Sequence, residues 1–505
     1  RIGKEELDMK YYVSASEMKL YDRNTVEEIG IPACVLMERA ALSAVEAVEE
    51  HCAGLQGRRY VLVMAGTGNN GGDGLAVARL LAERGYNVEV WCVGDREKAT
   101  EQWRQQMRIL EKFPVKFVEE PVRQEYGVMI DGLFGVGLCR EVEGSFREAV
   151  ETFRRRNGWK LALDVPSGVD SDTGKIWGCG VRADMTVTFG FCKRGLALYP
   201  GCEFAGEVRT ADIGISERSF FGMEPEMYAL DEPVGELMPK RRNDGNKGSF
   251  GKVLLVAGSE NMAGAAVLAA RAAYRAGAGM VKIVTPQVNR VILQCTVPEA
   301  LLSVPENLAS DMDWADVVAM GPGAGQYGTA FSCLEQVIRE GEKPLVLDAD
   351  GLNLLAGHPK WRESLAGQGK AGRKIVLTPH VGELGRLVGK TVAECKQDLP
   401  AIGKGLAAEL HAVVVAKDAR TFICGENRGI CVNLSGNSGM ATAGSGDVLA
   451  GVIAGLLAQG MDAFRAAAVG AYIHGRAGDA AAAIKGEHGC MAGDIVEHIG
   501  EGGCR

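Results

Sequence analysis

The sequence has too little of several features to fit a specialised class of protein. Its 505 residues carry a net charge of -9, so it lacks the basic excess of a general nucleic-acid binder. The 14 cysteines include no C-x-x-C pair, which argues against a zinc ribbon or a disulfide scaffold and for reduced thiols in the cytoplasm. The longest apolar segment, 440–458, is interrupted by Asp447. We therefore expect neither a nucleic-acid partner nor a membrane partner.

The N-terminus lacks the apolar stretch of a signal peptide, because residues 1–10 are mostly polar. We interpret residues 1–8 as a tag remnant that precedes Met9. At 505 residues the chain is too long for one ordinary core, which predicts roughly two to four domains. Its 68 glycines predict many tight loops and close backbone contacts with ligands.

A glycine-rich loop in the first half stands between two predicted strands. Residues 59–65 are apolar, GTGNNGGDG follows at 66–74, and residues 75–84 have helical spacing. With the next strand at 87–93, this pattern predicts a right-handed βαβ crossover. Residues 16–24 and 32–51 predict two earlier helices. In the second of these, the following residues are predicted to face a core: Val35, Leu36, Ala40, Val45 and Val48.

Polar side chains follow three predicted strands of this half. Asn70 follows the first strand, Asp131 ends the strand 128–131, and Asp164 and Ser167 end the strand 161–164. Ligands of open α/β sheets bind outside the carboxyl ends of the strands, so we expect one shared site. Oxygen-bearing side chains at 69–73 suit a hard cation. Two structural roles would explain the same residues without a ligand. The asparagines and glycines could simply form turns, and the carboxylate could be capped by local hydrogen-bond donors.

The strings GTGNNGGDG, DGLFGVGL and LDVPSGVD, in this order, resemble the NAD(P)HX epimerase family over about residues 11–215. The resemblance implies that Asn70, Asp131 and Ser167 bind K⁺, and that Asp164 faces the nicotinamide as the acid/base group. It also implies that the following residues contact the hydrated cofactor: Asn69, Asn70, Gly71, Gly72, Asp73, Gly135, Val136, Gly137, Leu138, Cys139, Arg140, Glu141 and Asp164.

A connector rich in proline and basic residues separates this half from a second α/β pattern. Pro225, Pro233 and Pro239 lie in the segment 215–246, and strands and helices alternate again from residue 252 onward. We therefore predict two domains, 11–225 and 228–505. The first is expected to be a Rossmann-like three-layer sandwich, and the second a three-layer sandwich of its own.

The segment 437–447, NSGMATAGSGD, is the strongest candidate site of the second half. It is rich in glycine, and the all-apolar run 448–458 after it predicts a buried helix. A glycine-rich turn at a helix start offers unpaired backbone N–H groups and the positive end of the helix dipole to an anion. Asp447 would then lie beside a transferring phosphate and could accept a proton from an attacking hydroxyl. A buried helix with a capping aspartate explains the same residues.

Further strands of this half also end in polar or glycine-rich segments. Gly323 ends the run that begins at Val317, His380 lies in the run that begins at Ile375, and Lys417 and Arg420 lie in the run that begins at Val413. A lone histidine is more often structural, and a charge pair is more often solvated. At strand ends that face an anion site, however, such groups could bind phosphates.

The string Gly444-Ser-Gly-Asp447 resembles the anion-hole motif of ribokinase-like kinases, and residues 228–505 resemble the NAD(P)HX dehydratase domain. The resemblance implies a ribokinase-like fold, Asp447 as catalytic base, and contacts of Gly323, His380 and Asp447 with the hydrated cofactor. It implies a nucleotide site formed by Lys417, Asp418, Ala419, Arg420, Thr421, Asn437, Ser438, Gly439, Met440, Ala441, Thr442, Ala443, Gly444, Ser445 and Gly446. Mg²⁺ and ADP are the expected cofactor and phosphoryl donor.

The sequence therefore predicts a repair enzyme for hydrated NADH and NADPH, with an epimerase half and an ADP-dependent dehydratase half. A vitamin or sugar kinase with an accessory domain is the first alternative, and it predicts a stable phosphorylated product. A nucleotide-sensing module without turnover and, for the first half, a lipid-carrier-binding protein with a decayed site are the others. Glycine- and alanine-rich helices often pack between subunits, so we also expect a homo-oligomer.

Overall fold

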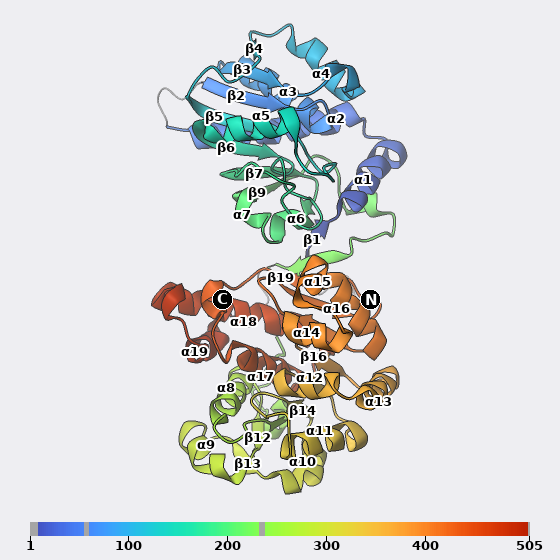
Figure 1. Ribbon diagram of the computed structural model, residues 1–505, viewed down its shortest axis with the longest axis vertical. Helices are drawn as coiled ribbons and strands as arrows, with labels where there is room; N and C mark the ends of the chain where they lie inside the picture. The colour runs from blue at the N-terminus through green and yellow to red at the C-terminus, as the bar shows by residue number, and fades with distance from the viewer. Residues whose placement is uncertain (1–8, 55–59, 232–237, 503–505) are drawn as a thin grey trace. The chain divides into compact units, whose positions relative to one another are not determined.

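The structure, a computed structural model, describes residues 9–54, 60–231 and 238–502. Residues 1–8, predicted to be a tag remnant, lie outside the described residues, as do Arg59 of the first predicted strand and Pro233 of the connector. The chain forms two compact units, Tyr11–Met227 and Tyr228–Arg505, and Met9 and Lys10 group with the latter. Each unit has its own sheet with helices packed on it (Figure 1).

The sheet of the first unit is parallel and has the strand order β4-β3-β2-β5-β6-β7-β9. Its strands are β2 (Tyr60–Ala65), β3 (Asn87–Cys92), β4 (Lys116–Val118), β5 (Glu125–Gly132), β6 (Asn157–Leu163), β7 (Met185–Phe189) and β9 (Glu207–Ala211). The order reverses direction between β2 and β5. In such sheets this reversal leaves a crevice outside the carboxyl ends of the two strands, where ligands bind.

Helices cover both faces of this sheet because the side chains of its strands alternate in direction. Val61, Val63 and Ala65 of β2 join a core with helices α2 to α4, whereas Leu62 and Met64 join a core with α5. The helices of the unit are α1 (Ala15–Asn24), α2 (Ala33–Cys52), α3 (Asn69–Glu83), α4 (Glu101–Leu110), α5 (Gly144–Arg155), α6 (Arg194–Ala197) and α7 (Cys202–Ala205). The unit is thus a three-layer sandwich, as expected.

A short strand pair holds the N-terminal helix of this unit. β1 (Met9–Val13) runs parallel to β8 (Cys192–Lys193), with Tyr12 opposite Cys192. α1 then begins in a capping box, in which the Ser14 hydroxyl accepts from the Glu17 N–H and the Glu17 carboxylate accepts from the Ser14 N–H. This start sets the direction in which α1 leaves the strand.

The second unit has another mostly parallel sheet, with the order β13-β12-β11-β14-β15-β16-β17-β18-β19. Only the pairings of β18 with β17 and β19 are antiparallel within this run. Its strands are β11 (Lys252–Val256), β12 (Met280–Val284), β13 (Leu301–Ser303), β14 (Val317–Met320), β15 (Leu345–Leu347), β16 (Ile375–Leu377), β17 (Val413–Ala416), β18 (Thr421–Gly425) and β19 (Ile430–Asn433). The strand β10 (Met227–Leu230) spans the boundary between the units. The strand order of the second sheet reverses between β11 and β14.

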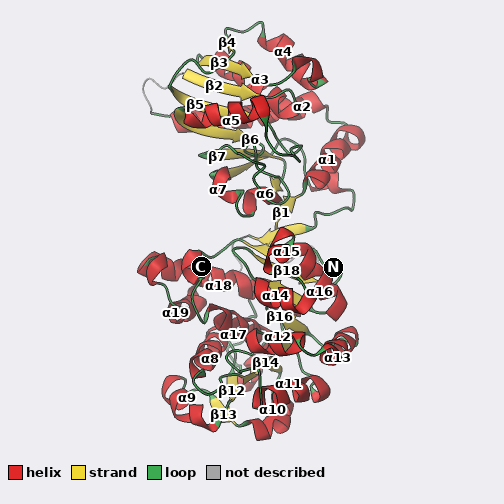
Figure 2. Cartoon of the chain, viewed as in Figure 1, coloured by secondary structure: helices red, strands yellow, loops and turns green. Residues whose placement is uncertain are grey.

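Two groups of helices pack in this unit, with strands drawn between them (Figure 2). One group is α8 (Ala263–Arg275), α17 (Ser445–Ala458), α18 (Ala463–Lys485) and α19 (Ala492–Gly502). The other is α11 (Thr329–Glu340), α12 (Ala349–Ala356), α13 (Pro359–Lys370), α14 (Val381–Val388), α15 (Val392–Gln397) and α16 (Leu399–Leu410), and the unit also contains α9 (Arg290–Thr296) and α10 (Leu308–Trp314). The α17 run is buried along almost its whole length, as its uniform apolarity predicts.

The predicted α/β class and the two three-layer sandwiches are confirmed, but two local predictions are wrong. α3 begins at Asn69 rather than at residue 75, because its first-turn glycines pack against backbone. A Cβ on Gly71 would lie 1.9 Å from the Gly66 carbonyl oxygen, so the helix can begin this close to the strand only with glycine there. Val35 is 42% exposed and does not face the core, whereas Leu36, the next residue, is buried.

The helices of the described residues include none that is both long and apolar enough to span a membrane.

Candidate active sites

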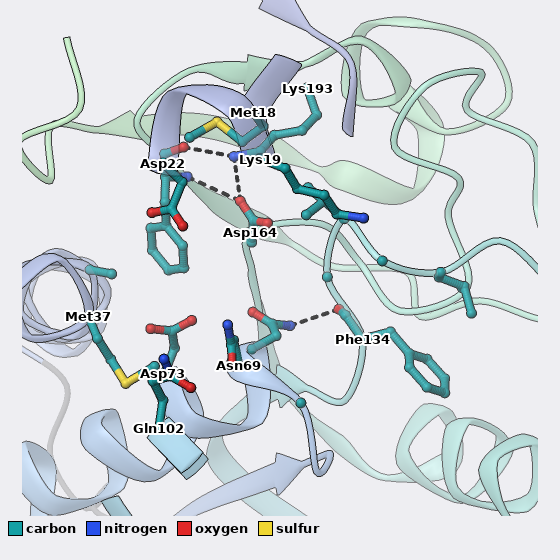
Figure 3. A pocket seen from close by; sticks show the side chains of 18 of the residues that line it. Met18, Lys19, Asp22, Met37, Asn69, Asp73, Gln102, Phe134, Asp164 and Lys193 are labelled. Carbon is teal, nitrogen blue, oxygen red and sulfur yellow. Dashed lines mark hydrogen bonds and ion pairs between the residues drawn. The ribbon is translucent and has the colours of Figure 1, made fainter. Parts of the chain in front are cut away.

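A cavity of about 710 Å³ lies in the first unit, between the loops that follow β2 and β5. Helices α1 and α2 contribute further parts of its wall, and Figure 3 shows its lining side chains. The charged residues that line it are Lys19, Asp22, Asp73, Arg140, Asp164 and Lys193. The cavity thus occupies the crevice at the reversal of strand order, with charges of both signs on its wall.

Asp164 is held at this wall by a buried lysine. Lys193 Nζ lies 2.5 Å from Asp164 Oδ1 and also donates to the Phe189 carbonyl oxygen at 2.7 Å. The Phe189 N–H approaches Asp164 Oδ1 at 3.3 Å. Asp164 has a φ of +65°, a left-handed conformation that aspartate tolerates better than most residues. Because the Lys193 side chain is 1% exposed, the ion pair fixes the carboxylate in one place.

Asp73, on the first turns of α3, is the second carboxylate of interest in the cavity. Among the described residues it has no hydrogen-bond or ion-pair partner, and its side chain faces the space that Figure 3 shows. Burial raises the pKa of Asp73 well above its usual value, and the charges of Asp164 and Asp22 raise it further, against an opposing contribution from Lys193. Burial is also the main cause of the raised pKa of Asp22.

Asp131 and Ser167, from two neighbouring strand ends, are hydrogen-bonded to each other. The Ser167 hydroxyl donates to Asp131 Oδ1 at 2.6 Å, and the Ser167 N–H donates to Asp131 Oδ2 at 2.8 Å. Burial raises the pKa of Asp131 to about 6, although these hydrogen bonds oppose the shift. Asn70 Nδ2 donates to the Phe134 carbonyl oxygen at 2.7 Å, while Asn70 Oδ1 is buried without a hydrogen-bond partner in the described structure.

The predicted cofactor-contacting residues do not all line this cavity. Asn69, Asn70, Asp73, Asp164 and residues 135–140 line it. Gly71, Gly72 and Glu141 are not among its lining residues. A Cβ on Gly72 would lie 3.1 Å from Met37 Cε, so Gly72 allows α3 to pack against α2. Cofactor contact remains a prediction for all of these residues.

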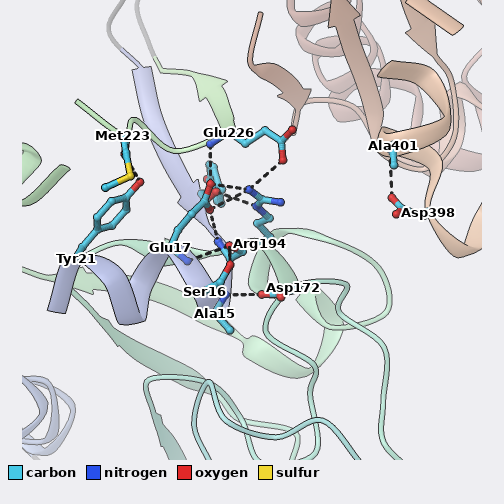
Figure 4. Close-up of polar contacts among 12 residues, drawn as sticks. Ala15, Ser16, Glu17, Tyr21, Asp172, Arg194, Met223, Glu226, Asp398 and Ala401 are labelled. Carbon is cyan, nitrogen blue, oxygen red and sulfur yellow. Dashed lines mark hydrogen bonds and ion pairs between the residues drawn. The ribbon is translucent and has the colours of Figure 1, made fainter. Parts of the chain in front are cut away.

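An arginine next to Lys193 fastens α1 beside the cavity (Figure 4). Arg194 Nη2 donates to both Glu17 carboxylate oxygens, at 3.0 and 2.9 Å, and lies 3.6 Å from Glu226 Oε2. At the start of the same helix, the Ala15 N–H donates to Asp172 Oδ1 at 2.6 Å. These contacts hold the helix that contributes Met18, Lys19 and Asp22 to the wall. We did not predict Lys193, Arg194 or Asp22 from the sequence, because no recognisable string surrounds them.

The first unit also carries exposed thiols. Cys139 is an exposed free cysteine on the loop that follows β5, and it lines the cavity. Cys34, at the start of α2, is exposed as well but is not a lining residue.

The start of α17 forms the centre of the second candidate site. Gly444, with a φ of +91°, precedes the helix, which has no side-chain cap. The Ser445 N–H donates to the Thr442 carbonyl oxygen at 3.3 Å, but the N–H groups of Gly446 and Asp447 have no carbonyl partner among the described residues and are available to an anion. A Cβ on Gly444 would lie 2.4 Å from Leu268 Cδ1, so α8 packs directly against this turn. Asp447 lies in the same first turn.

The pKa of Asp447 is raised to about 7, first by burial and then by the carboxylate of Asp348. Lys417 opposes the shift, and Asp350 and Glu383 add smaller increases. A group with this pKa can both accept and release a proton near neutral pH, which is what a general base requires.

Lys417, at the end of β17, is paired with Asp348, at the end of β15. Lys417 Nζ donates to Asp348 Oδ1 at 2.9 Å, and the Thr378 hydroxyl donates to the same oxygen at 2.7 Å. Burial alone would lower the pKa of Lys417, but the neighbouring carboxylates, Asp348 first, raise it overall. A Cβ on Gly446 would lie 3.2 Å from Lys417 Nζ, so this glycine allows the ammonium group to approach the α17 start.

His380 and Glu383 form a capping box at the start of α14, next to this pair. The His380 N–H donates to Glu383 Oε2 at 2.9 Å, and His380 Nε2 lies 3.3 Å from Glu383 Oε1. An isolated parallel bridge joins His380 to Lys417. The pKa of Glu383 is raised, mainly by burial. The structure therefore brings together His380, Lys417 and the start of α17, which lie far apart in the sequence.

A buried histidine stands behind the helix start. His474 Nε2 and Ser445 Oγ are 3.3 Å apart, and burial lowers the pKa of His474 to about 4, so the ring is neutral. Sequence reasoning missed His474, Asp348 and Glu383 as site residues, because strand-end acids and a helical histidine have common structural roles.

The segment before α17 is held by hydrogen bonds to α18. Asn437 Nδ2 donates to Asp479 Oδ1 at 2.9 Å, and the Gly436 N–H donates to Asp479 Oδ2 at 3.0 Å. Ser438 donates to Glu487. Of the other predicted nucleotide contacts, Arg420 Nη1 donates to the Leu434 carbonyl oxygen at 2.8 Å, and Asp418 pairs with Lys396 at 3.1 Å.

The remaining predicted contact, Gly323, lies on the loop after β14. Its φ is +56°, and a Cβ there would lie 2.8 Å from the Ala265 Cβ of α8. Nearby, the Gly325 N–H donates to Asp350 Oδ2 at 2.9 Å. Gly323 and the α17 start thus both contact α8, which places them on adjoining parts of the same site region.

The fold and the two sites define a two-unit α/β enzyme, in which each unit carries acidic and basic side chains beyond the carboxyl ends of parallel strands. Residues 253–500 match the family model described as NAD(P)H-hydrate dehydratase, and residues 33–195 match that of the YjeF-related protein N-terminus. A bifunctional NAD(P)H-hydrate repair enzyme from Moorella thermoacetica is 36% identical, over 97% of this chain and 96% of its own. One from Coxiella burnetii is 37% identical, over 94% of this chain and 95% of its own.

The chain therefore belongs to the family of bifunctional NAD(P)H-hydrate repair enzymes. A solved ADP/ATP-dependent NAD(P)H-hydrate dehydratase from Bacillus subtilis is 28% identical, over 53% of this chain and 94% of its own, with a TM-score of 0.47.

Proposed function

We propose that this protein repairs hydrated NADH and NADPH with two activities. An epimerase in residues 11–225 interconverts the R and S forms, and a dehydratase in residues 228–505 returns the S form to NADH or NADPH. The dehydratase converts ADP to AMP and phosphate. The observation that carries the proposal is Asp447, whose pKa is raised to about 7 at an uncapped, glycine-preceded helix start beside Lys417.

In the dehydratase, Asp447 accepts the proton of the ring hydroxyl as that oxygen attacks the terminal phosphate of ADP. The backbone N–H groups at 444–447 stabilise the charge that develops on the transferring group. The lone pair of the ring nitrogen then expels phosphate, and the ring loses a proton to restore its double bond. Lys417, Asp418, Ala419, Arg420, Thr421 and residues 437–446 bind the nucleotide, while Gly323 and His380 contact the hydrated ring.

Mg²⁺ fits this site as the companion of the nucleotide phosphates. Asp348 Oδ1 is engaged by Lys417 and Thr378, but Oδ2 accepts no hydrogen bond from the described residues. This oxygen lies 3.8 Å from the Cβ position of Gly446, and it would hold the ion near the α17 start. A Mg²⁺ bound by one or two carboxylates and phosphates would neutralise charge on the transferring group.

K⁺ fits the first site for a similar reason. The buried Asn70 Oδ1 has no hydrogen-bond partner among the described residues, and an amide oxygen is a suitable ligand for a hard cation. Asp131 and Ser167 would complete the oxygen set. The ion would position the loops that carry Asn70 and Phe134, while Asp164 acts as the acid/base group of the epimerase.

Direct assays test both activities. Hydrated NADPH incubated with enzyme, ADP and Mg²⁺ should regain nicotinamide absorbance, and without ADP its epimer ratio should move towards equilibrium. A stable phosphorylated product would instead indicate a kinase, and binding without ADP consumption would indicate a sensor. A comparison of the thermal shifts caused by ADP and by ATP measures the preference for the phosphoryl donor. A comparison of the epimerisation rates in K⁺ and in Na⁺ tests the proposed K⁺ site.

We also propose a cytoplasmic homo-oligomer, on the grounds of cysteine usage and of the glycine- and alanine-rich helix α8, part of which is exposed. Light scattering during size-exclusion chromatography would measure the mass of the assembly, and a monomer mass would refute that part of the proposal.

A further inference from the structure

Two carboxylates line the cavity of the first unit in contrasting states. Asp164, which follows β6, is bound to the buried ammonium of Lys193 at 2.5 Å. Asp73, on α3, has no ion-pair or hydrogen-bond partner in the described part of the chain. They come from different elements of the wall, and Figure 3 shows them apart from each other, across part of the cavity. Both therefore have access to a molecule bound between them.

The charged groups around the two carboxylates differ. Burial raises the pKa of Asp73 well above its usual value, and Asp164 and Asp22 add to the shift. A protonated carboxyl group at Asp73 can donate a proton. The Asp164 carboxylate instead pairs with the ammonium of Lys193, and a carboxylate held in this way can accept a proton. Carboxyl pairs whose environments separate their roles in this way are typical of acid/base sites.

The substrate chemistry of the proposed epimerase requires such a pair. The hydroxylated ring carbon is also bonded to the ring nitrogen, so it is a carbinolamine carbon. Exchange of its configuration needs either loss of the hydroxyl group or opening of the carbon–nitrogen bond. The first route resembles inverting displacement at a sugar carbon, where one carboxyl group protonates the leaving oxygen and another activates water on the opposite face.

Resting on the proposed epimerase function, we infer that Asp73 and Asp164 are its opposed acid and base, and that epimerisation proceeds by loss and re-addition of water. The Asp73 carboxyl group donates its proton to the ring hydroxyl. The carbon–oxygen bond breaks, its electron pair leaves with the oxygen as water, and the lone pair of the ring nitrogen forms a carbon–nitrogen double bond.

Water then attacks the opposite face of the same carbon. Its oxygen forms the new bond, the double-bond pair returns to nitrogen, and its proton goes to Asp164. The product is the other epimer, with no change in oxidation state. The enzyme is left with Asp73 ionised and Asp164 protonated, which is the state that catalyses the reverse conversion. Lys193 is a positioning residue, because it holds Asp164 against the wall through its own bonds to Phe189 and Thr188.

Isotope transfer from solvent tests the route. The full-length enzyme is given one purified epimer of hydrated NADPH in H₂¹⁸O, without ADP, and the other epimer is analysed by mass spectrometry at early times. One solvent oxygen should enter each molecule that changes configuration. Conversion at the enzymatic rate with retention of the original oxygen would overturn the inference and favour ring opening. Absence of any enzymatic conversion would instead refute the proposed epimerase function.

Replacement of Asp73 tests its assignment as the acid. Asp73→Asn keeps the shape of the side chain but cannot donate the proton, so kcat should fall by about 10²-fold or more with a small change in KM. The variant should unfold at the same temperature as the wild type or a higher one, since a neutral amide carries no burial penalty for charge. Asp95→Asn, on an exposed turn outside the cavity, keeps its N-capping role and should retain the wild-type rate. A wild-type kcat for Asp73→Asn would overturn the assignment.

Discussion

Asp447 lies at the start of a helix, and burial there disfavours ionisation of its carboxyl group. In the assigned role it must be ionised to accept a proton. Because its pKa is raised to about 7, the kcat/KM of dehydration should fall as the pH drops below about 7. Asp447→Asn should lower kcat by about 10²–10⁴-fold at pH 8, as removal of a general base does. Full dehydratase activity in this variant would refute the role.

The same residue should reduce the stability of the folded protein. Between the unfolded pKa of about 4 and the folded pKa of about 7, the native state retains a proton that the unfolded state has lost. The free energy of unfolding therefore decreases as the pH rises through this window. Asp447→Asn should be more stable than the wild type at pH 8, by about 1–2 kcal/mol after allowance for partial solvent access, but not at pH 3.5.

Urea denaturation at the two pH values measures this difference. Asp313→Asn, on an exposed turn of α10, is the matched control and should change the stability by less than about 0.5 kcal/mol at both. Equal stability of wild type and Asp447→Asn at pH 8 would contradict the raised pKa.

The sequence identified candidate site residues where a local string carries them, and missed the candidates that only the fold brings together. Asn70, Asp131, Asp164 and Asp447 follow strands or begin a helix within glycine-rich strings, so their positions were readable. Lys193 is far from Asp164 in sequence. Asp164 follows β6 and Lys193 lies shortly after β7, so the pairing of β6 with β7 brings the two together. A pairing of this kind has no local signature, and the same applies to Asp348 with Lys417 and to His474 with Ser445.

At the scale of elements, the turn before α17 can be tested with two glycines of equal φ. Gly444 and Gly460 both have a φ of +91°, one before the helix and one after it. A Cβ on Gly444 would meet Leu268 at 2.4 Å, whereas one on Gly460 would meet nothing within 4 Å. Alanine at either site should incur the left-handed backbone strain, about 1 kcal/mol, but Gly444→Ala should lose a further 1–3 kcal/mol or so from overpacking.

Thermal unfolding of the two variants separates these contributions. Gly444→Ala should also weaken ADP binding, because the displaced turn carries the N–H groups at 444–447, while Gly460→Ala should bind ADP normally. Equal destabilisation of both variants would show that α8 does not pack tightly against the turn.

Periodicity predicted the elements well, because most strands are short apolar runs that end in polar or glycine residues. The strand predicted at 87–93 agrees with β3 to within a residue, and the predicted strand ends at 131 and 164 lie within a residue of the ends of β5 and β6. The start of α3 was misplaced because glycine and asparagine usually signal a turn, whereas here they begin a helix. Val35 was misplaced because the helical spacing does not by itself fix which neighbouring residue faces the sheet.

At the scale of the whole molecule, the two activities should be separable, since each compact unit carries its own site. Asp447→Asn should abolish ADP-dependent dehydration and leave the epimerisation rate unchanged. Asp164→Asn should do the reverse, and asparagine suits the left-handed φ of +65° at that position. Chromatographic epimer ratios and nicotinamide absorbance measure the two rates in one sample. Loss of both activities in either variant would indicate a single shared site.

Family membership also bears on the alternatives raised by the sequence. A vitamin or sugar kinase leaves the first unit without a role, whereas the relatives from Moorella thermoacetica and Coxiella burnetii match the chain across both units. The cavity of the first unit keeps Asn70, Asp73 and Asp164 on its wall, which speaks against a decayed site.

The solvent-facing thiol of Cys139 gives the first unit a built-in probe. Because this sulfur stands on the wall of the ligand cavity, an occupant should shield it from a maleimide dye. With Cys34 and Cys295, two other exposed cysteines, and Cys504, which lies outside the described residues, all changed to serine, the labelling rate would report ligand binding to this unit independently of turnover. Inactive variants and colourless fragments of the cofactor could then be ranked by affinity in a simple fluorescence titration.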